Sequence, residues 1–191
     1  MENFAANYLD SAGKQFEYYK MLGEKTFQQL EEQDLFFQPG PESNSIAIIV
    51  KHLWGNMLSR WTDFLTADGE KDWRDREGEF EATIRNGDEL RQYWETGWSC
   101  LFQALSTVNE ENFHTIVYIR NKGHSVVEAV NRQLAHYAYH VGQIVFIGRM
   151  IKGEGWQSLS IPKGQSSAYN EKHFAQPKRR EHFTDEFLDK Q

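Results

Sequence analysis

The chain has 191 residues, a length typical of one domain with a sizeable hydrophobic core. Its formal net charge of -7 argues against a nucleic-acid-binding surface, because such a surface needs clustered Lys and Arg to neutralise phosphates. Apolar residues make up 39% and aromatic residues 14% of the chain, a composition that excludes extensive disorder.

The sequence shows no targeting or membrane signal. Residues 1–4 have no basic start followed by an apolar stretch, and charges or His interrupt every apolar run well short of a membrane span. We therefore expect a cytoplasmic protein with no membrane partner and no nucleic-acid partner. The single cysteine, Cys100, excludes an internal disulfide and a Cys-rich zinc site. It lies between Trp98 and Phe102, a pattern that favours a small buried residue over a nucleophile.

Apolar residues at helical spacing predict two helices in the first third of the chain. The first spans about residues 3–32, before the helix-breaking sequence Gln-Pro-Gly-Pro at 38–41. The second begins after the capping candidates at 43–45 and ends near residues 67–69. A polar, charged connection follows from about residue 70 to residue 87.

Two further helices are predicted in the second half, with a small hairpin between them. The third helix spans about residues 88–107, and the β-branched stretch 115–119 with a turn at 120–123 predicts the hairpin. Ser125 and Glu128 form a capping box that begins the fourth helix, which extends to about residue 152. This helix is apolar nearly all round, so we expect it to be buried or to pack on two partners.

These elements predict an all-α fold, a four-helix bundle with one long crossover connection, over residues 1–155. The segment 156–191 lacks steady periodicity, and we expect it to be partly irregular. Its basic run at 178–180 is interpreted as a solvated tail. Bundles build their metal and cofactor sites in the core, from side chains on facing helices.

Three of the seven histidines form a pattern suited to metal binding. His136 and His140 are four residues apart on the fourth helix, so both imidazoles can reach one ion. His52 lies midway along the second helix, at the border of its apolar stripe. Three neutral imidazoles with an open position match a catalytic zinc site. The spacing equally allows structural histidines that bond to backbone carbonyls or Tyr hydroxyls, and no Glu lies between His136 and His140 as it does in zincin proteases.

The remaining polar candidates have weaker patterns. His114 and His124 flank the predicted hairpin, where they either contact a ligand or are solvated, and His173 and His182 have no assigned role. Two amides lie one turn from the metal candidates: Asn56 from His52 and Gln133 from His136. They either orient the imidazole rings by hydrogen bonds or pair with the backbone. No residue is identified as a general acid or base.

The stretches 48–56, 133–144 and 156–166 resemble the DinB/YfiT-like superfamily of bacterial proteins. This resemblance spans about residues 1–170 and implies a four-helix bundle with the long crossover. It also implies a divalent metal, most often zinc or nickel, held by one His of the second helix and two of the fourth. These positions correspond to His52, His136 and His140. Many members of the superfamily are homodimers.

The resemblance implies two classes of activity. Some members are described as metal-dependent hydrolases, and others are thiol-dependent enzymes such as bacillithiol transferases and a mycothiol-dependent isomerase. We therefore expect a small-molecule substrate and a metal that activates either water or a low-molecular-weight thiol. The alternative is a non-catalytic metal-binding or damage-response protein in which the ion braces the bundle. The apolar surface of the fourth helix predicts a homodimer, unless the segment after the bundle covers that surface.

Overall fold

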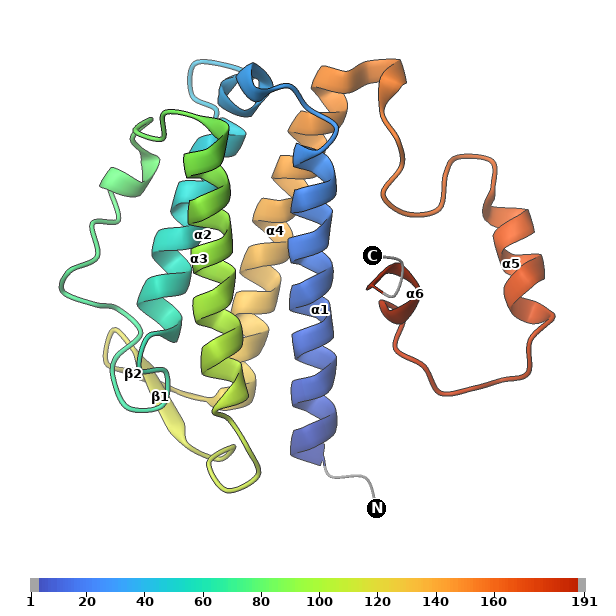
Figure 1. The fold of residues 1–191 in the computed structure, drawn as a ribbon. Helices are drawn as coiled ribbons and strands as arrows, with labels where there is room; N and C mark the ends of the chain where they lie inside the picture. The colour runs from blue at the N-terminus through green and yellow to red at the C-terminus, as the bar shows by residue number, and fades with distance from the viewer. Residues whose placement is uncertain (1–3, 189–191) are drawn as a thin grey trace.

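The computed structural model describes residues 4–188, and its four longest helices form a bundle (Figure 1). They are α1 (Phe4–Phe27), α2 (Ile46–Trp61), α3 (Gly87–Ser106) and α4 (Val126–Lys152). Helix α1 packs beside α3 and α4, and α2 packs beside the same two helices. The predicted all-α bundle is thus confirmed. None of the described helices has the length and apolar character needed to cross a membrane.

A long crossover, residues 62–86, connects α2 to α3 and contains the short 3-10 helix η2 (Gly78–Phe80). It returns from the lower end of α2 to the upper end of α3, so these two helices run in the same direction (Figure 1). Helix α2 ends at Trp61, earlier than the predicted 67–69, because Thr62 is extended and Asp63 has a left-handed φ of 51°. Phe64 still packs on Trp61, which explains why the apolar pattern continues beyond the helix.

The first helix is also shorter than predicted. It ends at Phe27 rather than near residue 32, and the chain turns through 28–31 into the 3-10 helix η1 (Glu32–Phe36). The N-termini of the later helices follow their capping residues. Ser45 accepts a hydrogen bond from the N–H of Ile48, and the Ser125–Glu128 capping box forms as predicted.

The predicted hairpin is formed by β1 (Ile116–Ile119) and β2 (Lys122–Ser125), which pair antiparallel with Ile116 opposite Ser125. Its two turn residues, Arg120 and Asn121, have left-handed φ values of 54° and 59°. The Asp68 carboxylate accepts hydrogen bonds from both backbone N–H groups, each at 2.8 Å. This contact fastens the crossover to the hairpin and stabilises the turn.

The centre of the bundle is aromatic, and Tyr137 of α4 lies fully buried in it. Its hydroxyl accepts a hydrogen bond from Trp61 Nε1 at 3.0 Å and donates one to Asn56 Oδ1 at 3.1 Å. Because successive helical residues are rotated by about 100°, burying Tyr137 turns His136 and His140 to one side of α4. The position of one core tyrosine therefore orients both histidines.

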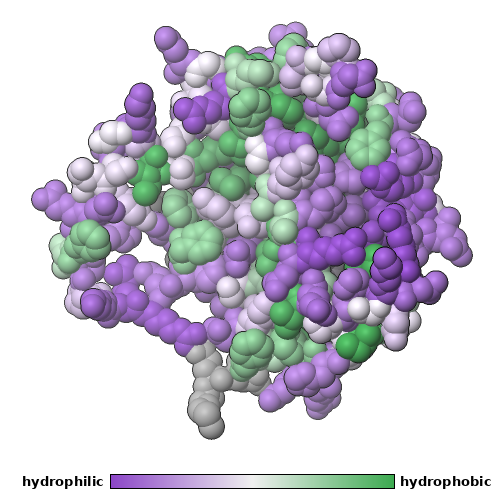
Figure 2. Space-filling view, turned by 180° about the vertical axis from the view of Figure 1, so that it is seen from behind, coloured by the Kyte–Doolittle hydropathy of each residue, from purple (hydrophilic) through white to green (hydrophobic). Residues whose placement is uncertain are grey.

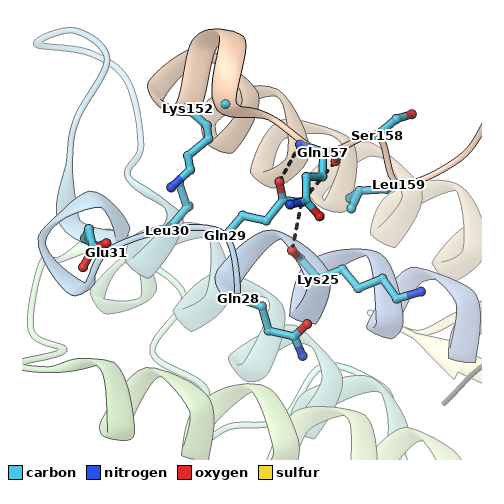
Figure 3. A pocket seen from close by; sticks show the side chains of 10 residues that line it. Lys25, Gln28, Gln29, Leu30, Glu31, Lys152, Gln157, Ser158 and Leu159 are labelled. Atoms are coloured by element: carbon cyan, nitrogen blue, oxygen red, sulfur yellow. Dashed lines mark hydrogen bonds between the residues drawn. The ribbon is translucent and has the colours of Figure 1, made fainter. Parts of the chain in front are cut away.

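The chain after α4 lies against α1. It passes through η3 (Gly153–Gly155), and Gln157 and Gln29 then exchange hydrogen bonds beside a hollow of about 650 Å³ (Figure 3). Two short helices follow, α5 (Ser166–Phe174) and α6 (Asp185–Leu188). Helix α6 packs on α1, whereas α5 buries no residue, and the space-filling view shows openings between this segment and the bundle (Figure 2).

Candidate metal centre

The structure brings His52 of α2 together with His136 and His140 of α4. The Nε2 atom of His136 lies 3.3 Å from that of His52 and 3.1 Å from that of His140. Nitrogens bound tetrahedrally to one zinc ion, with bonds of about 2.05 Å, lie about 3.3 Å apart. These two distances therefore fit a shared divalent ion, and each of the three residues offers a ligand nitrogen within 4.8 Å of the other two.

Hydrogen bonds on the opposite ring atoms fix two of the imidazole tautomers. His52 Nδ1 donates to Glu79 Oε2 at 2.9 Å, because an ionised carboxylate can only accept. His140 Nδ1 donates to Gln143 Oε1, also at 2.9 Å. When these two rings are neutral, their Nε2 atoms carry lone pairs, and these converge on His136 Nε2. At most one N–H lies among the three nitrogens, so the cluster is a donor set for a cation.

The His136 and His140 rings are neutral near pH 7, as metal ligands must be. Burial first, and then the nearby charges of His140, His52, Arg60 and Arg74, lower the pKa of His136 to about 3. Burial first, and then the nearby charge of His52, lower the pKa of His140 to about 4. Protons therefore do not compete with a metal ion for these two nitrogens at physiological pH.

Glu79 of the crossover holds the His52 ring from behind. Its carboxylate is 3% exposed and pairs with Arg74, whose Nε lies 2.7 Å from Oε1. Burial alone would raise the pKa of Glu79, but the hydrogen bonds from His52 and Arg74 outweigh it and hold that pKa below its ordinary value. Gly55 makes room for this carboxylate, since a Cβ at that position would lie 2.3 Å from Glu79 Oε1.

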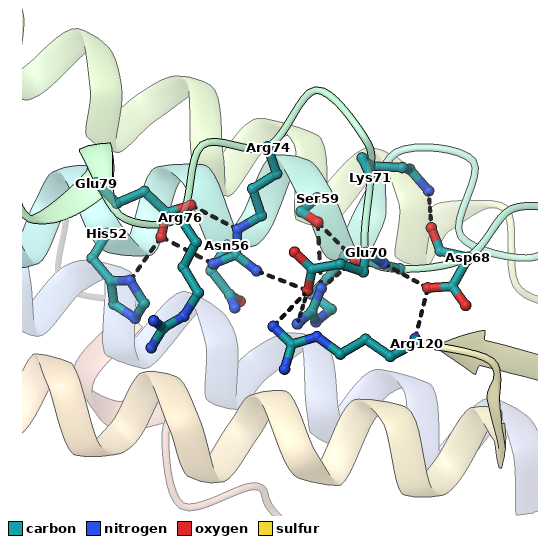
Figure 4. A network of polar contacts seen from close by, with 12 residues as sticks. His52, Asn56, Ser59, Asp68, Glu70, Lys71, Arg74, Arg76, Glu79 and Arg120 are labelled. Carbon is teal, nitrogen blue, oxygen red and sulfur yellow. Dashed lines mark hydrogen bonds and ion pairs between the residues drawn. The ribbon is translucent and has the colours of Figure 1, made fainter.

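Polar contacts continue from Glu79 along the crossover to the hairpin (Figure 4). The Glu70 carboxylate is shared by three guanidinium groups, those of Arg60, Arg74 and Arg120, at 3.1, 3.5 and 3.1 Å. Burial, and then the adjacent charge of Arg74, lower the pKa of Arg60. The three guanidinium groups outnumber the two carboxylates, Glu70 and Glu79, with which they pair, so this part of the network carries excess positive charge.

A cavity of about 440 Å³ lies against the three histidines. Its wall includes Phe80, which stacks on the His52 ring with 4.8 Å between centroids, and Tyr139 of α4. The other lining residues are two amides and five arginines, namely Asn56, Gln133, Arg60, Arg74, Arg76, Arg120 and Arg132. Among the described residues, no Asp or Glu lines this cavity.

The side-chain oxygens of Asn56 and Gln133 take neither of the two roles left open for these amides, orienting an imidazole or pairing with the backbone. Asn56 Oδ1 accepts from Tyr137 instead, and Gln133 Oε1 is buried without a hydrogen-bond partner in the described chain. The His52 ring is held by Glu79 and the His140 ring by Gln143. Glu79 was missed because the crossover has no periodicity that would place it, whereas Gln143 follows His140 by three residues, a spacing that points to contact on a helix.

The other chemical candidates lie apart from the cluster. His114 is exposed, and His124 lies in β2 opposite Val117. His182 contacts Ser11 of α1 with its Nε2 atom, at 3.0 Å, and so helps to attach the C-terminal segment. Burial raises the pKa of the Cys100 thiol, which disfavours the thiolate needed for a nucleophile.

Comparison with known proteins gives one family. A family model described as "Protein of unknown function (DUF1572)" matches residues 3–165, whereas no curated protein and no solved structure matches the chain. The match covers the whole bundle, including all three clustered histidines. The chain therefore belongs to the DUF1572 family, which is a DinB-like family.

Proposed function

We propose that this chain is a metal-dependent enzyme in which His52, His136 and His140 hold one divalent ion, zinc or nickel, next to a substrate cavity. The observation that carries the proposal is the ligand set. Three imidazole nitrogens converge, no fourth His, Cys, Asp or Glu among the described residues joins them, and the cavity lies against the three rings. Three protein ligands beside an accessible cavity are typical of catalytic rather than structural zinc sites.

When bound, a divalent ion supplies Lewis acidity that lowers the pKa of a coordinated water or thiol towards neutrality. The residues of this chain supply the positioning. Glu79 keeps the Nδ1 proton on His52 and so presents the Nε2 lone pair, and Gln143 does the same for His140. Phe80 covers one face of the His52 ring.

The cavity favours a nucleophile that needs no separate general base. No described carboxylate lines the cavity, and both Glu79 oxygens are engaged by His52 and Arg74. Water and a low-molecular-weight thiol both meet this condition once their pKa is lowered. A volume of about 440 Å³ accommodates much more than a water molecule, which favours a thiol co-substrate together with a small electrophile.

Metal content and thiol binding test the proposal. Purified protein should contain about one divalent ion per chain, and His136→Ala should lose most of it because two imidazoles retain an ion poorly. His114→Ala is the matched control, since His114 lies outside the cluster. Full metal occupancy in the double variant His52→Ala, His136→Ala would place the ion elsewhere.

Cobalt substitution then distinguishes an enzyme from a protein with a structural ion. Adding a small thiol such as 2-mercaptoethanol to the cobalt protein should produce a sulfur-to-metal charge-transfer band. A spectral change with azide but none with thiols would favour water as the nucleophile. An unchanged spectrum with thiols, azide and other small anions would show a closed site and a bracing role for the metal.

A further inference from the structure

The cavity beside the histidines carries positive charge in a chain whose formal net charge is -7. Five arginines line it, and they come from four parts of the fold: α2, the crossover, the hairpin turn and α4. A cavity lined by one sign of charge concentrates ligands of the opposite sign. Arg74 pairs with Glu79 and so helps to hold the His52 ring. In the described chain, the other four arginines form no ion pair with the residues that hold the histidine rings.

The neighbouring carboxylates do not balance these arginines. Glu70 is shared by Arg60, Arg74 and Arg120, and Glu79 pairs only with Arg74 among them. The remaining two arginines, Arg76 and Arg132, are exposed. Arg76 pairs with Glu77, whose side chain is 89% exposed, so that contact contributes little. Arg132 has no ion-pair partner in the part of the chain that the structure describes.

The backbone at Arg120 supports a functional role for its side chain. Arg120 has a φ of 54°, in the left-handed region that Asn and Gly occupy at lower cost than Arg. Asp68 stabilises this turn through both backbone N–H groups. The guanidinium extends from the turn back along the crossover towards the histidines, and the Arg76 side chain likewise points towards α4 (Figure 4).

We propose that Arg76, Arg120 and Arg132 form an anion subsite that binds a carboxylate or phosphate group of the substrate. The inference rests on the proposed function, since it places the charged group of the substrate beside the metal-activated nucleophile. Guanidinium groups suit this role because their planar forks bind paired anionic oxygens. Gln133 Oε1, a buried acceptor without a partner in the described chain, lines the same cavity and is available to an N–H or O–H of that ligand.

Calorimetric titration of the full-length, metal-loaded protein at low ionic strength tests the subsite. The probes are succinate, inorganic phosphate and neutral succinamide. Succinate or phosphate should bind and succinamide should not, and the tighter of the two anions identifies the class of group. Arg132→Gln and Arg120→Asn should each weaken anion binding about tenfold, because each removes a charge-assisted contact. Arg149→Gln, on the same helix as Arg132 but outside the cavity, should bind like the unmodified protein.

Two further measurements separate this subsite from a purely structural role and from the metal chemistry. Asn is favoured at a left-handed position, so Arg120→Asn should keep or raise the thermal midpoint while losing anion affinity. The metal content of both variants should stay unchanged. Anion affinity equal to that of Arg149→Gln, or no anion binding by the unmodified protein, overturns the subsite whatever the metal content. Arginine-dependent binding in protein that never holds metal would support the subsite and contradict the proposed metal-dependent reaction.

Discussion

Glu79 is the crossover residue that forms a hydrogen bond with the histidine cluster. It accepts from His52 Nδ1, and it also carries the Arg74 ion pair in a buried position. In the proposed metal site, this carboxylate orients the His52 ligand and raises its basicity. The ligand histidine and its supporting carboxylate are 27 residues apart, so the site depends on the crossover as well as on the helices.

We predict that Glu79→Gln weakens metal binding by roughly 10- to 100-fold, because a neutral amide accepts more weakly from His52 and no longer balances Arg74. A competition titration with a chromophoric chelator measures this affinity. Glu77→Gln serves as the matched control, since Glu77 is two residues away and almost fully exposed. Equal affinity in the two variants would contradict the role assigned to Glu79.

The pH dependence of stability in metal-free protein gives a second test at the residue scale. The folded-state pKa values of His136 and His140, about 3 and about 4, lie below the ordinary value of 6.5. The unfolded chain therefore binds more protons between about pH 3 and pH 6.5, and stability falls as the pH is lowered through this window. Each extra proton that the unfolded chain binds relative to the folded chain adds about 1.4 kcal/mol per pH unit to the slope of the free energy of unfolding.

Urea unfolding at several pH values measures the effect after chelation of the metal. His136→Ala should flatten the dependence below pH 6.5, because this variant lacks one of the two histidines that are protonated in the unfolded chain but neutral in the folded chain. His114→Ala should leave it unchanged, since His114 is exposed. A slope that is the same in all three proteins would show that the buried histidines do not control acid stability.

At the scale of elements, local signals were the most predictive. Helix α4 begins at its capping box as predicted, because Ser125 and Glu128 satisfy the first N–H groups without help from the rest of the fold. The histidine pair on α4 could be predicted for the same reason, since helical spacing alone brings residues four apart together. Placing His52 opposite them required the family resemblance, because facing helices are not fixed by spacing.

Other features depend on tertiary contacts that no local pattern encodes. The early end of α2 follows from the left-handed Asp63, a residue type that tolerates helix and turn alike. Glu79 reaches His52 only because the crossover folds back over Gly55. The surplus of arginines in the cavity was likewise hidden, since Arg76, Arg120 and Arg132 lie in different elements.

Close packing of α1 on α4 gives a prediction at this scale. A Cβ on Gly148 would lie 2.5 Å from Thr26 Cγ2, whereas one on Gly142 of the same helix would meet nothing within 4 Å. Gly148→Ala should therefore lower the free energy of unfolding by about 1–3 kcal/mol through overpacking. Gly142→Ala should raise it by about 0.5–1 kcal/mol through helix propensity. Urea denaturation measures both, and stabilisation of equal size in the two variants would mean that α1 and α4 are less closely packed.

At the scale of the whole molecule, the C-terminal segment leaves the outer face of α4 uncovered. Tyr139, Phe146 and Met150 are 63%, 68% and 45% exposed and lie on one side of the helix. Helix α6 packs on α1 instead, and Figure 2 shows apolar side chains reaching the surface on the side opposite to the view in Figure 1. In the part of the chain that the structure describes, the segment after the bundle therefore leaves these three side chains uncovered.

We propose that a second copy of the chain packs against this outer face of α4 and forms a homodimer. Exposed aromatic residues grouped on one face are typical of an interface, and a twofold axis would pair this helix with its own copy.

Sedimentation velocity at micromolar concentration should give the dimer mass. Phe146→Glu should shift the protein to the monomer mass, because it places a charge within the apolar contact. Phe174→Glu is the control, since Phe174 is 85% exposed on α5, away from α4. A monomer in the unmodified protein, or a dimer that survives Phe146→Glu, would contradict an interface formed by this face.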